Sequence, residues 1–270
     1  MKRLLTIQDL SCVGQCSTTV ALPLVSACGI ECAVLPPAIL SNHTGGFKSW
    51  SFADLTGELP KVEAQWVAQD IRFDAFYTGY VCESHIDPIL SIVKTCANPG
   101  AVRIVDPAMA DNGVLYKGFA DDFPSKMARL VKGADYVLPN LTEAALLVGE
   151  APKMVLTEPE TVRLIGKLHE LGAKNVILTG VSFDPDRLGT AISDGTSIAY
   201  DFNERLTRCA HGTGDVFASV FAGAILRGKT ALEASALAAD IVCEAIQKTD
   251  EGHWYGVCFE RTIPTLVKAF

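Results

Sequence analysis

Apolar runs of strand type alternate with helical patterns along almost the whole chain, and this alternation limits the possible folds more than any other feature. Several of these runs are short and nearly continuous, as expected for strands of a parallel sheet that is covered on both faces. The predicted strands are Arg3–Ile7, Cys32–Leu35, Ala75–Thr78, Val102–Val105, Tyr136–Leu138 and Asn175–Thr179. We therefore expect a three-layer α/β fold with a doubly wound, mostly parallel sheet and helices on both faces.

The helices expected between these strands follow a 3.6-residue period and begin at recognisable caps. They are Ser17–Ala27, Val62–Gln69, His85–Ala97, Phe123–Val131, Glu158–Leu171, Thr213–Leu226 and Ala231–Lys248. Thr157 and Thr230 each precede a glutamate at the spacing of a capping box. The segment Gly189–Tyr200 has the pattern of a β-hairpin that turns at Asp194–Gly195. No long linker or repeat interrupts the pattern, so we expect a single domain over residues 1–270.

Charge and cysteine usage narrow the class of protein. The chain has 270 residues, a formal net charge of -8 and a pI of about 5.1, so a nucleic-acid-binding surface is not expected. The uncharged stretch from Leu10 to Ile30 contains a proline and too many polar residues for a membrane span, so no membrane association is expected. Nine cysteines in no disulfide-like framework suggest reduced thiols and a cytoplasmic protein.

The sharpest motif is His211-Gly212-Thr213-Gly214-Asp215, at the start of a predicted helix. Backbone N–H groups and the helix dipole at such an end stabilise negative charge, and the glycines let a ligand approach the backbone. Asp215 could accept the proton of a substrate hydroxyl while the Gly-Thr-Gly backbone holds a phosphate. The alternative is an ordinary glycine loop with a favourable first-turn aspartate.

Two further groups of polar residues follow predicted strands, where folds of this kind bind ligands. Asp106 directly follows one strand and could meet Mg²⁺ or phosphate, and Asp111 stands nearby in an Asp-Asn-Gly sequence that also favours a turn. Asn140 and Glu143 follow the next strand. They have the spacing of a helix cap, and Glu143 could also reach a metal directly or through water. Both roles can coexist.

A second set of polar residues lies nearer the N-terminus. Ser41–Phe47 is a glycine-rich loop after an apolar strand, Thr78–Tyr80 ends another strand, and Asp9 follows the first strand. Taken separately, these segments are no more than turns. In a parallel sheet, Asp9 would be close to both of the other segments, which makes the three together a candidate ligand site.

Together these segments resemble the pyridoxal kinase branch of the ribokinase-like family, in order and spacing across nearly the whole chain. The matching segments are Thr6-Ile7-Gln8 with Gly14, Ser41-Asn42-His43-Thr44, Thr78-Gly79-Tyr80, Asp106-Pro107 with Asp111 and Gly113, Pro139-Asn140 with Glu143, Thr179, and Gly212-Thr213-Gly214-Asp215. The resemblance implies a ribokinase-like fold and ATP-dependent phosphorylation of the 5′-hydroxymethyl group of pyridoxal, pyridoxine or pyridoxamine. It also implies Mg²⁺, commonly a homodimer, and often a monovalent cation such as K⁺.

The resemblance further implies a role for each matching residue. Asp215 would be the catalytic base, and Gly212–Gly214, with Thr213 between the glycines, would form the anion hole. The residues expected to contact the vitamer are Asp9, Ser11, His43, Thr44 and Tyr80. Those expected to contact ATP are Asp106, Asp111, Asn140, Thr179, Gly212 and Gly214, and those expected near Mg²⁺ are Asp106 and Glu143.

Two residues depart from the family pattern. Asp9 stands where pyridoxal kinases usually carry serine, with Ser11 shortly after it, and an ionised Asp9 could pair with a protonated ring nitrogen or amine. His211 before Gly-Thr-Gly is similar to the hydroxymethylpyrimidine kinases of thiamine synthesis, which usually carry cysteine at the position of Asp215. A hydroxymethylpyrimidine kinase and a catalytically silent vitamer-binding protein are therefore the alternatives. Sugar kinases are disfavoured because the chain is too compact for their extra β-lid sheet.

Overall fold

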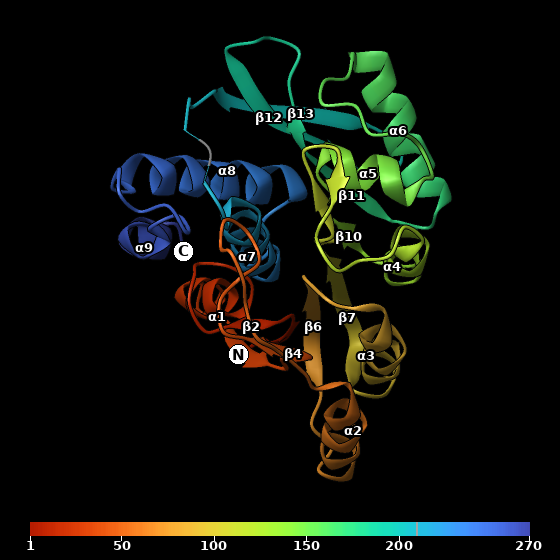
Figure 1. Ribbon diagram of the computed structural model, residues 1–270. Coiled ribbons are helices and arrows are strands. Elements are labelled where there is room, and N and C mark those ends of the chain that lie inside the picture. The colour runs from red at the N-terminus through yellow and green to blue at the C-terminus, as the bar shows by residue number, and fades with distance from the viewer. Residues whose placement is uncertain (209) are drawn as a thin grey trace. The chain divides into compact units, whose positions relative to one another are not determined.

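The computed structural model describes residues 1–208 and 210–270 (Figure 1). The chain divides into two compact units, one formed by residues 1–101 and 206–270 and the other by residues 102–205. The strands of the main sheet follow the order β13-β12-β11-β10-β7-β6-β1-β3, and β7 (Ala97–Val105) has residues in both units. The pairs that involve β1 and β10 are parallel, whereas β11, β12 and β13 pair antiparallel. The predicted mostly parallel α/β sheet is confirmed, and a single domain over 1–270 stays a prediction.

In the first unit, the parallel strands β6 (Phe73–Thr78), β1 (Arg3–Ile7) and β3 (Glu31–Val34) lie side by side. Its helical elements are α1 (Thr18–Ala27), η1 (Thr56–Glu58), α2 (Leu59–Ala68), α3 (Glu83–Thr95), α7 (Thr213–Leu226), α8 (Ala231–Lys248), η2 (Phe259–Thr262) and α9 (Ile263–Val267). Figure 1 shows α1 beside α7, and α7 beside α8. Gly223 permits the close approach of α1 and α7, because a Cβ there would lie 2.4 Å from the Cys28 Sγ.

A small second sheet in this unit was not predicted. It consists of β2 (Leu10–Ser11), β4 (Ala38–Leu40) and β5 (Phe52–Asp54). The expectation that the chain is too compact for an extra sheet near the N-terminus is therefore wrong. Strands of two or three residues are too short to show an alternating pattern in the sequence. This sheet matters for the site because β2 and β4 each lead directly into a loop that carries site residues.

The second unit contains the end of β7 and the strands β10 (Tyr136–Val137), β11 (Asn175–Val181), β12 (Arg187–Ser193) and β13 (Ile198–Glu204). Its helices are α4 (Phe123–Val131), α5 (Leu141–Leu147) and α6 (Glu158–Glu170). The predicted hairpin turn at Asp194 is confirmed, since its carboxylate accepts from the N–H groups of Thr196 and Ser197 at 2.8 and 2.9 Å. A shorter hairpin joins β8 (Ala110–Asp111) to β9 (Val114–Leu115).

Most predicted boundaries agree with the structure, and the largest difference lies at the start of β7. The helix predicted to end at Ala97 ends at Thr95, and β7 begins well before the predicted Val102. The sequence Asn98-Pro99-Gly100 is typical of a turn. Within the first unit, however, the Asn98 side chain donates to the Asp74 carboxylate at 2.8 Å, so a tertiary contact favours the extended backbone. Of the helices in the described part of the chain, none is long and apolar enough to cross a membrane.

Candidate active site

The segment that leads into α7 leaves its backbone open to a ligand. Gly212 precedes the helix with a φ of 81°, in the left-handed region that favours glycine. A Cβ at this position would lie 1.9 Å from the carbonyl oxygen of Gln15, so no larger residue fits. A Cβ at Gly214 would meet nothing within 4 Å, so that side of the backbone faces open space. The first turn of α7 therefore leaves N–H groups and a positive helix end accessible, and its expected role as an anion hole stays a prediction.

Asp215 lies in this first turn at intermediate exposure. The protein packed around its carboxyl group raises the pKa to about 7, and the negative charge of Asp9 acts in the same direction. The backbone N–H of Ser17 and the thiol of Cys16 donate to the carboxylate and lower its pKa. A pKa near neutrality suits a general base, because the ionised group is present and still holds a proton well.

Asp9, just after β1, is the second carboxyl group of this site and is buried. Burial raises its pKa, while hydrogen bonds from Ser17 and Ser11 lower it; the Ser11 hydroxyl donates at 2.7 Å. The Asp9 N–H donates to the carbonyl oxygen of Tyr80 at 3.3 Å, which confirms that the ends of β1 and β6 meet. The prediction that Asp9 and Tyr80 lie together is therefore correct, and the hydroxyl hydrogen of Ser11 is directed to Asp9.

Ser17 contacts both carboxyl groups and was missed from the sequence. Its backbone has a φ of 53° and a ψ of −131°, a combination that is rare outside glycine and costs about 1–3 kcal/mol. Strained residues of this kind cluster at active sites. Ser17 is the N-cap residue of α1, yet its side chain makes no cap hydrogen bond and serves Asp9 instead. The only sequence signal for Ser17 was its position at a predicted helix start, which suggests an ordinary cap.

His43 belongs to the loop after β4, and its ring nitrogens are both bound to backbone. The Nδ1 atom accepts from the Gly45 N–H at 3.1 Å, so Nε2 carries the hydrogen and donates to the carbonyl oxygen of Tyr255 at 2.6 Å. Burial lowers the pKa of His43, which keeps the imidazole neutral. His43 is buried, and its ring lies edge-on to Phe47 with centroids 4.9 Å apart. Thr44, the next predicted residue, is half-buried.

Tyr80 is half-buried between the end of β6 and the start of α3. Burial raises the pKa of its hydroxyl group, and nearby Cys82 and Asp9 raise it further. The phenol therefore stays protonated and can donate a hydrogen bond. In the first unit, the fold thus brings together four predicted residues, Asp9, Ser11, Tyr80 and Asp215. Two residues that were not predicted, Ser17 and Cys16, lie beside them.

In the second unit, three predicted residues meet at the carboxyl ends of neighbouring strands. Asp106 follows β7 and is buried, and Asn140 lies beyond β10. The register places Val105 opposite Val137, and Asn140 bridges to Thr179 of β11. Asp106 and Asn140 thus follow neighbouring strands as predicted, and Asn140 lies beside Thr179.

Glu143 caps α5, as its spacing predicts, and is bound more tightly than a simple cap requires. The Asn140 Oδ1 accepts from the Glu143 N–H, and the Glu143 Oε2 accepts from the Asn140 N–H, both at 2.9 Å. The Glu143 Oε1 accepts from the Met109 N–H at 3.2 Å. Burial raises the pKa of Glu143 above its ordinary value. The Ala110 N–H donates to this carboxylate as well. A carboxylate has about four acceptor positions, so one remains for a metal contact through water.

Asp111 begins a turn, as its Asp-Asn-Gly sequence predicts. It is exposed and ends β8, and its carboxylate accepts from the Asn112 N–H at 2.8 Å. Asn112 and Gly113 have φ values of 50° and 82°, as a two-residue hairpin turn requires. Its expected contact with ATP stays a prediction.

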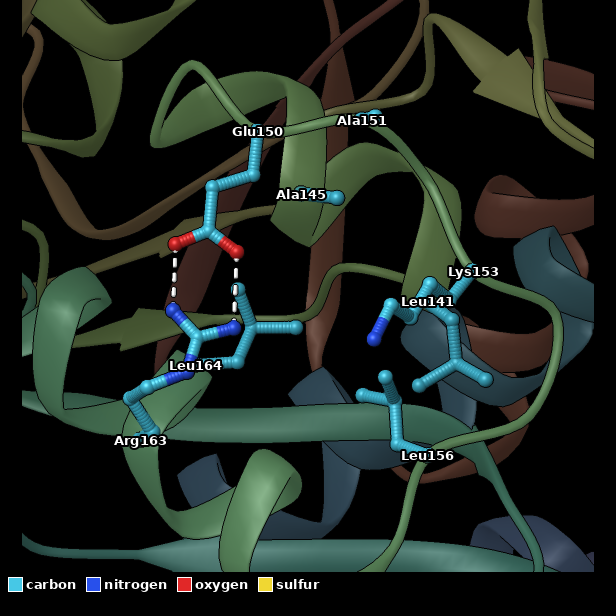
Figure 2. Close-up of a pocket in the computed structure, with 8 residues that line it drawn as sticks. All are labelled: Leu141, Ala145, Glu150, Ala151, Lys153, Leu156, Arg163 and Leu164. Atoms are coloured by element: carbon cyan, nitrogen blue, oxygen red, sulfur yellow. Dashed lines mark hydrogen bonds and ion pairs between the residues drawn. The ribbon is translucent and has the colours of Figure 1, made fainter.

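A surface hollow of the second unit contains none of the predicted site residues (Figure 2). Its charged lining residues are paired with one another or with neighbours. Glu150 accepts from Arg163 Nη2 at 2.8 Å and from Lys167 at 2.6 Å, and Lys153 pairs with Glu160 at 2.6 Å. Because these exposed pairs neutralise one another, the hollow is an ordinary surface feature and gives no sign of catalysis.

Comparison with known proteins gives matches over nearly the whole chain. A family model described as phosphomethylpyrimidine kinase matches residues 24–258. A pyridoxal kinase from Corynebacterium diphtheriae is 30% identical over 265 residues, which cover 91% of this chain and 89% of that protein.

Two solved structures are similar at comparable identity. The pyridoxal kinase of Lactobacillus plantarum matches with a TM-score of 0.92 and 30% identity, over 100% of this chain and 98% of that one. A candidate phosphomethylpyrimidine kinase from Bacteroides thetaiotaomicron, crystallised with pyridoxal, matches with a TM-score of 0.92 and 32% identity, over 98% and 95% of the two chains.

Proposed function

Since the chain belongs to the phosphomethylpyrimidine kinase family, we propose that it transfers the γ-phosphoryl group of ATP to the 5′-hydroxymethyl group of pyridoxal, pyridoxine or pyridoxamine. Its ribokinase-like fold and the full-length similarity to pyridoxal kinases support this activity. The observation that carries the proposal is Asp215, a carboxyl group with a pKa raised to about 7 beside the open backbone of a helix start.

Asp215 is the general base of the proposed reaction. Its ionised carboxylate accepts the proton of the substrate hydroxyl as that oxygen attacks the γ-phosphorus. The new O–P bond forms while the bond from the γ-phosphorus to the bridging oxygen breaks, and ADP leaves with that electron pair. The N–H groups of Thr213 and Gly214 lie where they can stabilise the charge on the transferring group, since the helix end there faces open space.

The vitamer is proposed to bind beside Asp9 in the first unit. The buried Asp9 carboxylate would face a protonated ring nitrogen or amine, and the protonated hydroxyl of Tyr80 would donate to the substrate. His43 would contribute only its ring face, since its nitrogens are bound to backbone, and Thr44 and Ser11 would complete the polar lining.

Asp106 and Glu143 are proposed to hold Mg²⁺, and Asn140, Thr179 and Asp111 to contact ATP. Mg²⁺ usually keeps several waters and takes one or two carboxylates together with substrate phosphates. The buried Asp106 at a strand end and the remaining acceptor position of the Glu143 carboxylate fit that requirement. When bound, Mg²⁺ neutralises phosphate charge.

A homodimer, a monovalent cation such as K⁺ and a cytoplasmic location are further parts of the proposal. The dimer and the cation rest on the resemblance to pyridoxal kinases, and the location rests on nine cysteines that form no disulfide-like framework. Sedimentation equilibrium checks the dimer, for which we expect twice the chain mass of 28.9 kDa.

A second candidate is a hydroxymethylpyrimidine kinase. The description of the matching family and His211 before Gly-Thr-Gly favour it. Asp215 disfavours it, because those enzymes usually carry cysteine at this position.

An ATP-consumption assay with the three vitamers, hydroxymethylpyrimidine and ribose tests the proposal. We expect the highest kcat/KM with one of the vitamers. A higher value with the pyrimidine would establish the second candidate instead. Vitamer binding in calorimetry without any ATP consumption would show a catalytically silent binding protein.

A further inference from the structure

Gln15 lies between two glycines that come from distant parts of the first unit. It belongs to the loop between β2 and α1, called here the N-terminal loop (residues 12–17). A Cβ at Gly212 would lie 1.9 Å from the Gln15 carbonyl oxygen, and one at Gly256 would lie 2.6 Å from its Oε1. Gln15 is therefore packed against the turn that precedes Asp215 on one side and against the C-terminal part of the chain on the other.

The side chain of Gln15 is bound at both of its polar atoms. The Nε2 donates to both carboxylate oxygens of Glu260 at 3.0 Å, and the Oε1 accepts from His253 Nε2 at 2.6 Å. His253, Gly256 and Glu260 all belong to residues 249–260, called here the C-terminal segment. These contacts tie the N-terminal loop to that segment.

The C-terminal segment is itself firmly held, so it can serve as an anchor. Arg208 donates to the carbonyl oxygens of Thr249 and Asp250 at 2.6 and 2.7 Å. Arg261 pairs with the Asp250 carboxylate at 2.9 and 2.6 Å. The Thr249 hydroxyl accepts from the Cys258 N–H at 2.8 Å, which closes the segment on itself.

The next two residues of the N-terminal loop, Cys16 and Ser17, are those that donate to Asp215. Ser17 holds its N–H in place through a backbone conformation, φ 53° and ψ −131°, that persists only where the surroundings enforce it. We propose that Gln15 is a positioning residue, which anchors the N-terminal loop to the C-terminal segment, holds the Ser17 N–H and the Cys16 thiol against Asp215, and so sets the pH range in which the base works. This inference rests on the proposed role of Asp215 as the general base.

The groups that face Asp215 determine the direction in which its pKa should change. Desolvation and the charge of Asp9 disfavour its ionised form, whereas the donors at Ser17 and Cys16 favour it. His211, which precedes the same turn, instead packs against Gly45, where a Cβ would lie 2.7 Å from its Nδ1. If the N-terminal loop loses its anchor, the two donors move away and the pKa of Asp215 rises. Ionisation of the base then requires a higher pH.

The test is the pH dependence of kcat/KM for the Gln15→Ala enzyme with the best vitamer. We expect the acid limb to move up by about 0.5–1 pH unit, with most of the activity recovered at about pH 9, because base ionisation is what is lost. Gln65→Ala, at an exposed position of α2, is the matched control and should keep the wild-type profile. Glu260→Ala should shift the acid limb in the same direction. Glu260→Gln retains an acceptor oxygen for Gln15 and should therefore keep the acid limb of the wild type.

Carbon-13 NMR titration of the Asp215 carboxyl group gives a readout that needs no turnover. Its resonance is assigned by its absence from Asp215→Asn, and it should titrate at higher pH in Gln15→Ala than in the wild type. This shift is measurable even if none of the vitamers is a substrate, so failure of the proposed function and failure of this inference are distinguishable. His253→Ala provides the same measurement if Gln15→Ala does not fold. An activity loss that is equal at every pH, or an unmoved Asp215 titration in the folded variants, would overturn the inference.

Discussion

At the scale of single residues, the site is governed by two carboxyl groups that the fold places near each other and desolvates. Asp9 and Asp215 each have a pKa raised first by desolvation, and each is partly compensated by hydrogen bonds from Ser17. Such a pair favours a cationic ligand, because a positive charge between them removes their mutual repulsion. Their separate roles, substrate recognition and proton transfer, can therefore be tested one residue at a time.

Asp215→Asn should lose turnover by about 10²–10⁴-fold, the usual value of general-base catalysis, while vitamer and nucleotide binding persist. The wild-type kcat/KM should rise with pH through the pKa of Asp215, about 7, because only the ionised form accepts a proton. Steady-state kinetics with calorimetry measures both effects. A variant that keeps more than half of the wild-type kcat would contradict the assignment.

The same substitution should stabilise the folded protein at about pH 8, by about 1–3 kcal/mol, because asparagine removes a desolvated charge. The folded-state pKa of about 7 lies above the ordinary 3.8, so the folded state binds the proton more tightly than the unfolded state. Wild-type stability therefore falls as the pH rises through this window. The advantage of Asp215→Asn should shrink as the pH falls and vanish toward about pH 3, below the unfolded pKa of 3.8, where both states of the wild type are protonated. Denaturant unfolding at a series of pH values measures it.

Asp9→Ser restores the residue that pyridoxal kinases usually carry and should change the preference among vitamers. If Asp9 binds a positively charged group of the substrate, the loss of kcat/KM in the variant should be largest with pyridoxamine. The loss should correspond to about 1.5–3 kcal/mol, the usual value of a hydrogen bond to a charged group. Pyridoxal and pyridoxine should lose less. Equal losses with all three vitamers, or no loss, would show that Asp9 only organises Ser11 and Ser17.

At the scale of elements, capping boxes begin helices in both units, and one of them differs from the rest. At α8, the Glu233 carboxylate accepts from the Thr230 N–H at 2.8 Å and is exposed. At α5, the corresponding Glu143 is buried and also accepts from Met109. A cap needs no such burial, so the extra burial is what supports a second role for Glu143.

Glu143→Gln should raise the Mg²⁺ concentration needed for half-maximal activity more than it raises the vitamer KM. The amide keeps one acceptor oxygen for the cap but cannot ionise, whereas the Glu143 carboxyl group can release its proton when Mg²⁺ stabilises the carboxylate. Glu233→Gln makes the same change in an exposed box and should alter neither quantity. Thermal unfolding is measured alongside. A lower melting temperature of Glu143→Gln with an unchanged Mg²⁺ response would show that Glu143 is only a cap.

At the scale of the whole molecule, each unit contains one set of the proposed ligand contacts. The first carries the base and the vitamer residues, and the second carries Asp106, Asn140, Glu143 and Thr179. A kinase of this kind should therefore gain stability from nucleotide without any chemistry taking place, because a ligand that binds only the folded state shifts the unfolding equilibrium.

A non-hydrolysable ATP analogue with Mg²⁺ should raise the melting temperature, with a stabilisation of about 2.7 kcal/mol at a ligand concentration of 100 times Kd. Asp215→Asn should show the same rise, because the base is not needed for nucleotide binding. Asp106→Asn is expected to show a smaller rise when Mg²⁺ is present. If the analogue leaves the melting temperature of the wild type unchanged, the proposed ATP site is wrong.

The sequence by itself determined the fold class and the boundaries of the long elements, and it supplied most of the residues proposed for the site. The 3.6-residue and continuous apolar patterns are local consequences of burial, so α4, α7 and α8 could be placed from residue types alone. The rule that parallel strands present ligands at their carboxyl ends predicted that Asp9 lies beside Tyr80, whereas the bridge between Asn140 and Thr179 is a finding of the structure.

Only the tertiary structure decided how the site residues are bound. The strands β2, β4 and β5 are too short for a pattern, and β7 extends through a turn-like sequence because of a contact with Asp74. The strained Ser17 and the anchored Gln15 carry no motif, since their partners lie far away in the sequence, near Gly212 and the C-terminus. The raised pKa of Asp215 depends on how many atoms surround its carboxyl group, which is a property of packing that no local pattern encodes.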